Sequence, residues 1–273
     1  RLQQALRDGD SAYPCAQAVA QAEAGAQVLD VNAGLPGIDE AATLEHLVQE
    51  LQAVTDLPLQ LDSTDPAALA RALRIYNGKP IVNSVNGEPE VLAKVLPLCK
   101  KYGVQVGAHP GLPDLQGFGR RKMAISPAEA EADVIYQIGA LKAFCDAAGV
   151  PLHHVKPHGA LYNMAAKDPE LAAAICRAVK AAAPEAMLLA LSGSEMIKAA
   201  QALGLRVCSE VFADRGYQPD GTLVPSGKPG AMIENEGEAI ARVLQMAKQG
   251  TVCAVDGSTV ALQADSVCVH GDG

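Results

Sequence analysis

Apolar positions along the chain follow two alternating spacings, which predicts a repeated strand–helix unit. Short apolar runs such as Leu152 to Val155 are each followed by a longer segment, such as Pro169 to Ala183, with helical spacing. Glycine, proline and capping residues separate the two kinds of segment. The pattern gives about eight main strands, at residues 28–32, 57–62, 80–85, 104–108, 152–155, 187–191, 206–211 and 266–269.

The two ends of the chain differ from this repeat. Two helical patterns, Arg1 to Arg7 and Pro14 to Ala24, precede the first strand, and no helix follows the last one. A length of 273 residues suits a barrel of parallel strands joined by helices. We therefore predict an α/β fold, a single (β/α)8 TIM-like barrel made by residues 1–273 as one domain. Two smaller domains or a doubly wound sheet is the alternative.

The composition of the chain indicates which kinds of binding partner and which cellular location to expect. The net charge is −9 and no basic block occurs, which argues against nucleic acid and against an anionic membrane surface. We find no apolar run near the length of a membrane span and no signal-peptide pattern, so we expect a cytoplasmic protein. The seven cysteines form no C-x-x-C pair, and we expect reduced, mostly buried thiols.

Polar residues are densest between His153 and Asn163, which hold three histidines, a lysine, a tyrosine and an asparagine. We expect a short strand that opens into a loop between two helices, and loops at the carboxyl ends of barrel strands carry ligand chemistry. His109, His158 and His270 each follow a predicted strand. They are candidate ligands of a divalent metal, helped by Asp114 or Asp272, that would polarise an amide or activate water. The alternative is that these histidines hydrogen-bond the loop backbone.

Other side chains that follow the predicted strands suit the binding and hydrolysis of an anionic substrate. Lys156 fits an electrophilic or anion-binding role, which Arg120, Arg121 and Arg215 would share. The alternative for Arg121, and also for Lys156, is a surface salt bridge. Asp214 is a candidate general base or the partner of Arg215. Tyr162 and Asn163 are candidate oxyanion donors or helix caps. The candidate catalytic set is Lys156, His158, Asp214, His109 and His270, and the candidate substrate-binding set is Arg120, Tyr162, Asn163, Arg215 and Asp272.

From Val104 onward the chain resembles the LamB/YcsF family, the A subunit of bacterial 5-oxoprolinase. The resemblance implies ring opening of 5-oxoproline to glutamate, with ATP supplied through partner subunits, since nothing in this chain resembles an ATP site. The residues that carry it are 107–114, 117–121, 136–141, 153–163, 210–215, 229–231 and 265–272.

Residues 1–103 resemble another family, the pterin-binding barrel of methyltetrahydrofolate-dependent corrinoid methyltransferases and cobalamin-dependent methionine synthase. The resemblance rests on residues 25–37, 59–63 and 80–88. It implies that strand-end Asp and Asn side chains hydrogen-bond the pterin ring of a tetrahydrofolate. The matching positions are Asp62 and Asn83, with Asp30, Asn32 and Asn86 less closely matched; the alternative for Asp62 is capping of the next helix.

Neither family pattern is whole. The opening Asp-Leu-Asn-Cys-Asp strand of the oxoprolinase pattern and its Gly-Phe-His-Ala-Gly-Asp strand are absent, and the pterin pattern lacks its opening and later strands. We therefore expect a mosaic joined near Gly103. Three functions follow: a 5-oxoprolinase-like amidohydrolase with an incomplete site, an engineered chimeric barrel without native activity, or a pterin-binding methyltransferase module.

Overall fold

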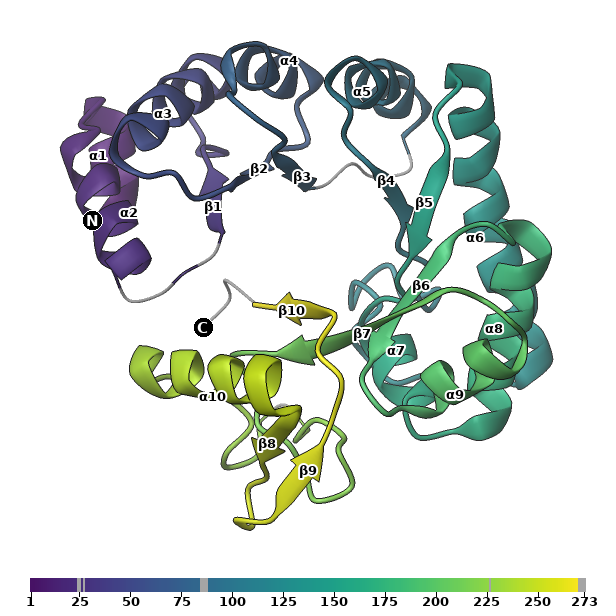
Figure 1. Ribbon diagram of the computed structural model, residues 1–273. Helices are drawn as coiled ribbons and strands as arrows, with labels where there is room; N and C mark the ends of the chain where they lie inside the picture. Colours follow the sequence, from purple (N-terminus) through teal and green to yellow (C-terminus); the bar gives the residue numbers. More distant parts are fainter. Residues whose placement is uncertain (24–25, 27, 84–87, 226, 270–273) are drawn as a thin grey trace. The chain divides into compact units, whose positions relative to one another are not determined.

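A computed structural model describes the chain except residues 24–25, 27, 84–87, 226 and 270–273. The protein is an α/β protein whose main strands are all parallel (Figure 1). None of the described helices is long and apolar enough to cross a membrane. The described helices are α1 Leu2–Asp8, α2 Ala12–Glu23, α3 Glu40–Val54, α4 Pro66–Ile75, α5 Pro89–Tyr102, α6 Pro127–Ala148, α7 Gly159–Ala165, α8 Pro169–Ala182, α9 Glu195–Ala202 and α10 Glu236–Gln249. The strands are β1 Leu29–Asn32, β2 Leu59–Asp62, β3 Ile81–Asn83, β4 Val106–Ala108, β5 Leu152–Val155, β6 Met187–Leu191, β7 Val207–Phe212, β8 Thr251–Cys253, β9 Thr259–Ala261 and β10 Ser266–Cys268.

The chain divides into two compact units. The first comprises residues 1–105 and 144–150, and its parallel sheet has the order β1-β2-β3. Leu59 and Leu61 of β2 are fully buried, whereas the alternating residues of the same strand are only partly buried. Because side chains alternate across a strand, this pattern gives the sheet one apolar face and one polar face. Figure 1 shows α3, α4 and α5 following one another along this sheet.

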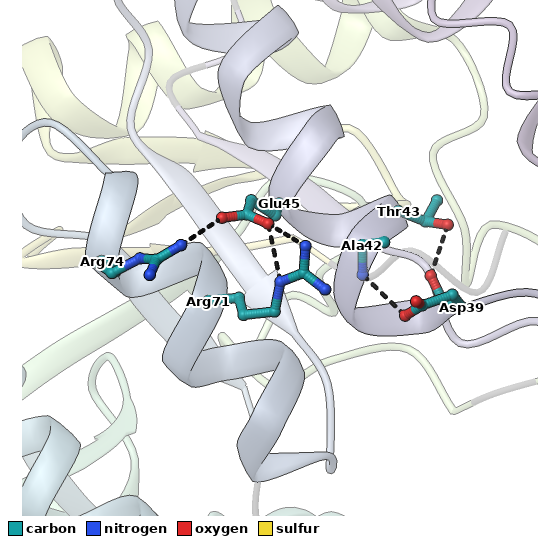
Figure 2. A network of polar contacts seen from close by, with 6 residues as sticks. All are labelled: Asp39, Ala42, Thr43, Glu45, Arg71 and Arg74. Carbon is teal, nitrogen blue, oxygen red and sulfur yellow. Dashed lines mark hydrogen bonds and ion pairs between the residues drawn. The ribbon is translucent and has the colours of Figure 1, made fainter.

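Local signals in the sequence begin the helices of the first unit. The Asp39 carboxylate accepts a hydrogen bond from the Ala42 N–H at the start of α3, and Asp65 does the same for Ala67 at the start of α4. Glu45 of α3 then joins the two helices through Arg71 and Arg74 of α4, as Figure 2 shows. The apolar faces of α3 and α4 can therefore pack while their outer faces stay charged.

The second unit comprises residues 106–143 and 151–273, and its parallel sheet has the order β10-β7-β6-β5-β4. The apolar core of this unit includes Val134 and Ile138 of α6, Ile175 of α8 and Leu188 of β6, all fully buried. Ser126 and Glu129 hydrogen-bond each other's backbone N–H groups and so fix the start of α6. A separate antiparallel pair, β8 and β9, follows α10.

The predicted strands are all present, and most agree with the structure to within two residues. Besides these main strands, the structure contains the short antiparallel pair of β8 and β9 near the end of the chain. One prediction was wrong: the segment after β5 is not only a loop, because Gly159–Ala165 form α7. Gly159 has φ 55, so the chain turns into this helix through a conformation that other residues rarely adopt. The closed barrel of eight strands stays a prediction, and Gly25 and Val85 lie outside the described residues.

Candidate functional site

The carboxyl ends of four strands in the second unit bring a set of polar side chains together. His109 follows β4, Lys156 follows β5, Glu210 lies in β7, and Cys268 ends β10. In a parallel sheet these ends share one edge, which explains why residues so distant in the sequence meet. Tyr162 joins them from the first turns of α7.

Lys156 and Glu210 form a largely buried ion pair. The Lys156 Nζ lies 2.6 Å from the Glu210 Oε1, and the two side chains retain 25% and 4% of their exposure. Burial is the largest single influence and would lower the pKa of Lys156, but the charge and hydrogen bond of Glu210 together with the adjacent Cys268 outweigh it, and the pKa lies above its ordinary value. Lys156 therefore stays a cation throughout the physiological range.

Tyr162 and Cys268 complete the surroundings of this pair. The Tyr162 hydroxyl donates to the Glu210 Oε2 at 3.0 Å, and the Cys268 Sγ lies 3.7 Å from the Lys156 Nζ. Burial, together with the adjacent Glu210 carboxylate, raises the pKa of Tyr162 well above its usual value, and burial raises the pKa of Cys268 to about 11. Both groups keep their protons at neutral pH, so Tyr162 is a donor and Cys268 is not a thiolate nucleophile.

His109 and His158 contact each other directly. The His158 Nδ1 lies 3.0 Å from the His109 Nε2, and the rings are edge to face with centroids 4.7 Å apart. The outer nitrogens face backbone carbonyls: His109 Nδ1 lies 2.6 Å from the Lys156 oxygen, and His158 Nε2 lies 2.6 Å from the Phe118 oxygen. The alternative of backbone hydrogen bonding by these histidines is therefore what the structure shows.

The three contacts of the histidine pair determine how many N–H hydrogens the two rings must carry. A carbonyl oxygen only accepts, so both outer nitrogens must carry hydrogen, and the contact between the rings needs a third. Two neutral imidazoles hold only two protons, so the full set of bonds requires one positive charge. Although part of His109 is open to solvent, burial of its ring lowers its pKa to about 4.

The metal site predicted from His109, His158 and His270 stays a prediction, because the structure describes only the first two of these histidines. All four ring nitrogens of His109 and His158 are engaged by protein atoms. The described part of the chain contains no group of three or more His, Cys, Asp or Glu side chains that could hold a metal ion. His270 and Asp272 lie outside the described residues, so their predicted roles stay predictions.

The remaining predicted residues of this unit have definite positions. Arg121 forms an ion pair with Asp114, which holds the pKa of that carboxyl down to about 2, so the surface salt bridge predicted as its alternative is present. Arg120 is exposed on the same loop. Asp214 is buried, and its carboxylate lies 3.3 Å from the Arg215 Nε, which favours the role of arginine partner.

Asn163 and Tyr162 differ in what their side chains contact. The Asn163 amide donates to the Gly159 backbone oxygen at 3.2 Å, a contact within α7. Tyr162 instead points its hydroxyl at Glu210. Asp168 caps the next helix, α8, so neither residue is its cap, and their role as oxyanion donors stays a prediction.

The polar face of the first unit presents a row of amides and carboxylates. Asn32, Asp62 and Asn83 are register partners on β1, β2 and β3, and the Asn32 amide donates to the Asp62 carboxylate at 3.1 Å. Asp30 accepts from Gln60 at 2.7 Å; reduced contact with water and the nearby Asp62 raise the pKa of Asp30. The cap of α4 is Asp65, so Asp62 is not the capping residue of that helix.

Glu210 is the site residue that the sequence pattern did not reveal. It lies in Val207–Phe212, a strand whose last four residues are all buried. A carboxylate in a buried apolar strand is costly unless it is paired, so its sequence context is itself a signal of a cationic partner. The partner, Lys156, could not be identified from spacing, because the two are 54 positions apart.

Comparison with known proteins confirms the resemblance to the LamB/YcsF family and, for the first part of the chain, a resemblance to pterin-binding enzymes. The LamB/YcsF family matches residues 83–273, and the family described as pterin binding enzyme matches residues 3–114. The two matches overlap at 83–114, around the junction expected near Gly103.

Individual relatives match most of the chain. The A subunit of 5-oxoprolinase from Clostridium beijerinckii is 57% identical over 186 residues, which are 68% of this chain and 73% of that protein. The protein of the same name from Bacillus subtilis is 54% identical over 187 residues, again 68% of this chain and 73% of that protein. A crystal structure of a lactam utilization protein from Thermus thermophilus covers 89% of this chain and 88% of its own, with a TM-score of 0.61 and 40% identity.

Proposed function

Because the chain belongs to the LamB/YcsF family, we propose that it binds 5-oxoproline and opens its lactam ring to give glutamate. The observation that carries this proposal is the buried Lys156–Glu210 pair with Tyr162 beside it. Two relatives named as the A subunit of 5-oxoprolinase, each more than half identical over the matched segment, support the choice of substrate.

The chemistry of lactam hydrolysis explains why this cluster suits the reaction. Attack of water on the ring carbonyl creates a tetrahedral oxyanion, and preorganised donors lower the barrier to its formation. Lys156 has three N–H donors, of which Glu210 and Cys268 take two, so one remains for the oxyanion or for the substrate carboxylate. Tyr162 keeps its proton, and its single O–H is donated to the same carboxylate, so Tyr162 orients Glu210 beside Lys156.

Glu210 acts in this proposal as a positioning residue. One of its oxygens accepts a hydrogen bond from Lys156 and the other accepts one from Tyr162, so it fixes the position of the Lys156 ammonium group. Asp214 follows the same strand and is the candidate base that removes a proton from the attacking water, once Arg215 releases it. Arg120 and Asn163 are the further candidates for contact with the substrate.

The site that we propose is incomplete. The curated relatives are matched over 73% of their length, and the two strand motifs that open the oxoprolinase pattern are absent from this sequence. Loss of a single oxyanion donor costs about 100- to 1000-fold in rate. We therefore propose that the chain still binds the lactam but hydrolyses it slowly. We also propose that ATP chemistry depends on partner subunits, because the relatives are named as one subunit of a larger enzyme.

A matched pair of variants tests this proposal. Lys156→Met removes the cation, whereas Lys198→Met removes an exposed lysine that pairs with Glu195 within α9. We expect 5-oxoproline to bind the unaltered chain and the Lys198 variant in calorimetric titration, and to bind Lys156→Met at least about tenfold more weakly. Equal affinity in all three proteins would contradict the assignment.

The first unit supports a second candidate function, binding of a reduced pterin such as methyltetrahydrofolate. The observation that favours it is the row of Asn32, Asp62 and Asn83 on adjacent strands, within a segment that matches a pterin-binding family. Amides and carboxylates in one row offer donors and acceptors to the edge of a flat heterocycle. An Asp62→Ala variant that binds methyltetrahydrofolate as well as the unaltered chain would remove this candidate.

The third possibility is a folded barrel without native activity. It predicts that neither ligand binds. If neither 5-oxoproline nor methyltetrahydrofolate binds while the chain unfolds cooperatively, this function is the one that remains. One cooperative transition on heating would also support the single closed barrel, whereas two separate transitions would contradict it.

A further inference from the structure

The loop between β4 and α6 exposes large apolar side chains. Leu115 retains 98% of its exposure and Phe118 retains 71%, although the chain is otherwise poor in aromatic residues. Residues 113–116 and 121–123 also surround an open hollow of about 430 Å³. Leu115 lines this hollow and Phe118 lies on the same loop, and exposed apolar side chains beside a hollow are typical of a contact surface for another molecule.

The backbone of this loop is fixed even though its side chains point outward. Phe118 has φ 52, a conformation that residues with side chains rarely adopt, and its carbonyl oxygen is held by His158. The Gly119 carbonyl accepts from the Ala160 N–H at 2.9 Å. A Cβ atom at Gly159 would lie 2.6 Å from the Gly119 oxygen, so the loop is seated directly against α7.

A second anchor lies earlier in the same loop. The Gln137 side chain of α6 receives the Gly111 N–H and donates to the Gly111 oxygen, both at 2.9 Å. An exposed aromatic side chain on a fixed backbone loses little conformational freedom when a partner covers it. The strained backbone of Phe118 is thus maintained in a position where its ring is presented to solvent.

The charge of the loop indicates the kind of partner. Arg120, Arg121 and Lys122 follow one another in a chain whose net charge is −9, and the nearby acid, Asp114, is buried and paired with Arg121. A symmetric contact with a second copy would place these cations against themselves. An acidic protein surface instead complements them.

We propose that the 113–123 loop is the docking surface for a different protein chain, whose face is an apolar pocket bordered by aspartate and glutamate. This inference rests on the proposed function, because the partner it requires is another component of the oxoprolinase assembly. Leu115 and Phe118 enter the pocket, and Lys122 contacts the acidic residues at its border. The histidine pair links this surface to the site, since His158 holds the Phe118 carbonyl and His109 the Lys156 carbonyl.

The test uses the remaining subunits of the Bacillus subtilis 5-oxoprolinase as the probe, immobilised for binding measurements with the full chain. Phe118→Asn removes the ring but keeps a residue that tolerates positive φ, so the loop is preserved. Leu115→Ser and Lys122→Glu remove the second apolar contact and reverse one charge. Tyr136→Ser is the control, because Tyr136 of α6 is an aromatic residue with 76% exposure outside the loop.

We expect Phe118→Asn to weaken binding by about 30-fold, as for a central aromatic contact, and Tyr136→Ser to leave it unchanged. Lys122→Glu should slow association most at low salt. Binding by the unaltered chain that none of the three loop variants weakens would overturn the inference and leave the proposed function intact. No binding by the unaltered chain would overturn both the docking surface and the proposed partner, while the titration with 5-oxoproline still tests the lactam site separately.

Discussion

Replacing Glu210 with Gln tests the central ion pair of the site most directly. The change keeps the size and shape of the side chain but removes its charge, so Lys156 is left as a mostly buried cation without its partner. Removal of one member of a buried pair costs about 3–5 kcal/mol. Since Lys156 keeps a quarter of its side chain exposed, we expect the low end, about 3 kcal/mol in the free energy of unfolding.

A double-mutant cycle separates this pair from general loss of packing. Lys156→Met alone leaves the Glu210 carboxylate buried beside the Tyr162 hydroxyl but without its cation, and should cost a similar amount. The double variant Lys156→Met with Glu210→Gln carries no unpaired charge. Its loss should therefore fall below the sum of the two single losses by about 2 kcal/mol.

Urea unfolding followed by far-ultraviolet circular dichroism measures these differences. Glu131→Gln is the control, because Glu131 pairs with Arg177 between α6 and α8 at a far more exposed position and should lose much less. A Glu210→Gln loss below about 1 kcal/mol, or single losses that add within about 0.5 kcal/mol, would refute the buried-pair argument.

The same pair predicts the alkaline limit of stability. The folded pKa of Lys156 lies above the ordinary 10.5, so the stability it contributes is complete below pH 10.5 and is lost as pH rises through the folded value. Glu210→Gln should flatten this alkaline loss. An unchanged alkaline slope in the variant would mean that Glu210 does not hold the proton on Lys156.

Three further predictions concern neighbouring groups. Stability should fall as pH drops from 6.5 toward 4, because burial keeps His109 neutral in the folded chain while the unfolded chain takes up a proton, and His109→Gln should reduce that fall in urea titrations. Iodoacetamide at pH 8 should modify the exposed Cys253 and spare Cys268, whose pKa is raised to about 11, as peptide mass spectrometry would show. Gly159→Ala should destabilise the chain by at least about 1 kcal/mol because of its positive φ, whereas Gly139→Ala in exposed helix should stabilise it by roughly 0.5–1 kcal/mol.

Much of the fold could be predicted because its signals are local. Asp39 and Asp65 cap the helices that follow them, and Gly103 ends α5 with φ 70, as its place after the last apolar position predicts. Strand positions followed from apolar runs between such signals. The helix α7 was missed because its first residue is a glycine and it has only seven residues, too few to show helical periodicity.

The site could be predicted only in part because its contacts are not local. The positions of the strand ends predict Lys156, His109 and His158 at one edge, and the structure joins them by hydrogen bonds. Those positions do not give the direction of each ring nitrogen, which in His109 and His158 is toward protein atoms. All seven cysteines are free as expected, but only three are buried, and Cys253 is exposed.

The two sheets place polar side chains at strand ends for the same reason, although their sequences resemble different families. In each sheet the apolar positions are used for packing against helices, and the residues at the carboxyl ends are left to carry chemistry. The fold therefore does not decide between lactam and pterin; the side chains do. Lys156→Met should alter only 5-oxoproline binding and Asp62→Ala only methyltetrahydrofolate binding, since each change acts within its own unit. If either variant weakened both ligands while remaining folded, the assignment of one ligand to each sheet would be wrong.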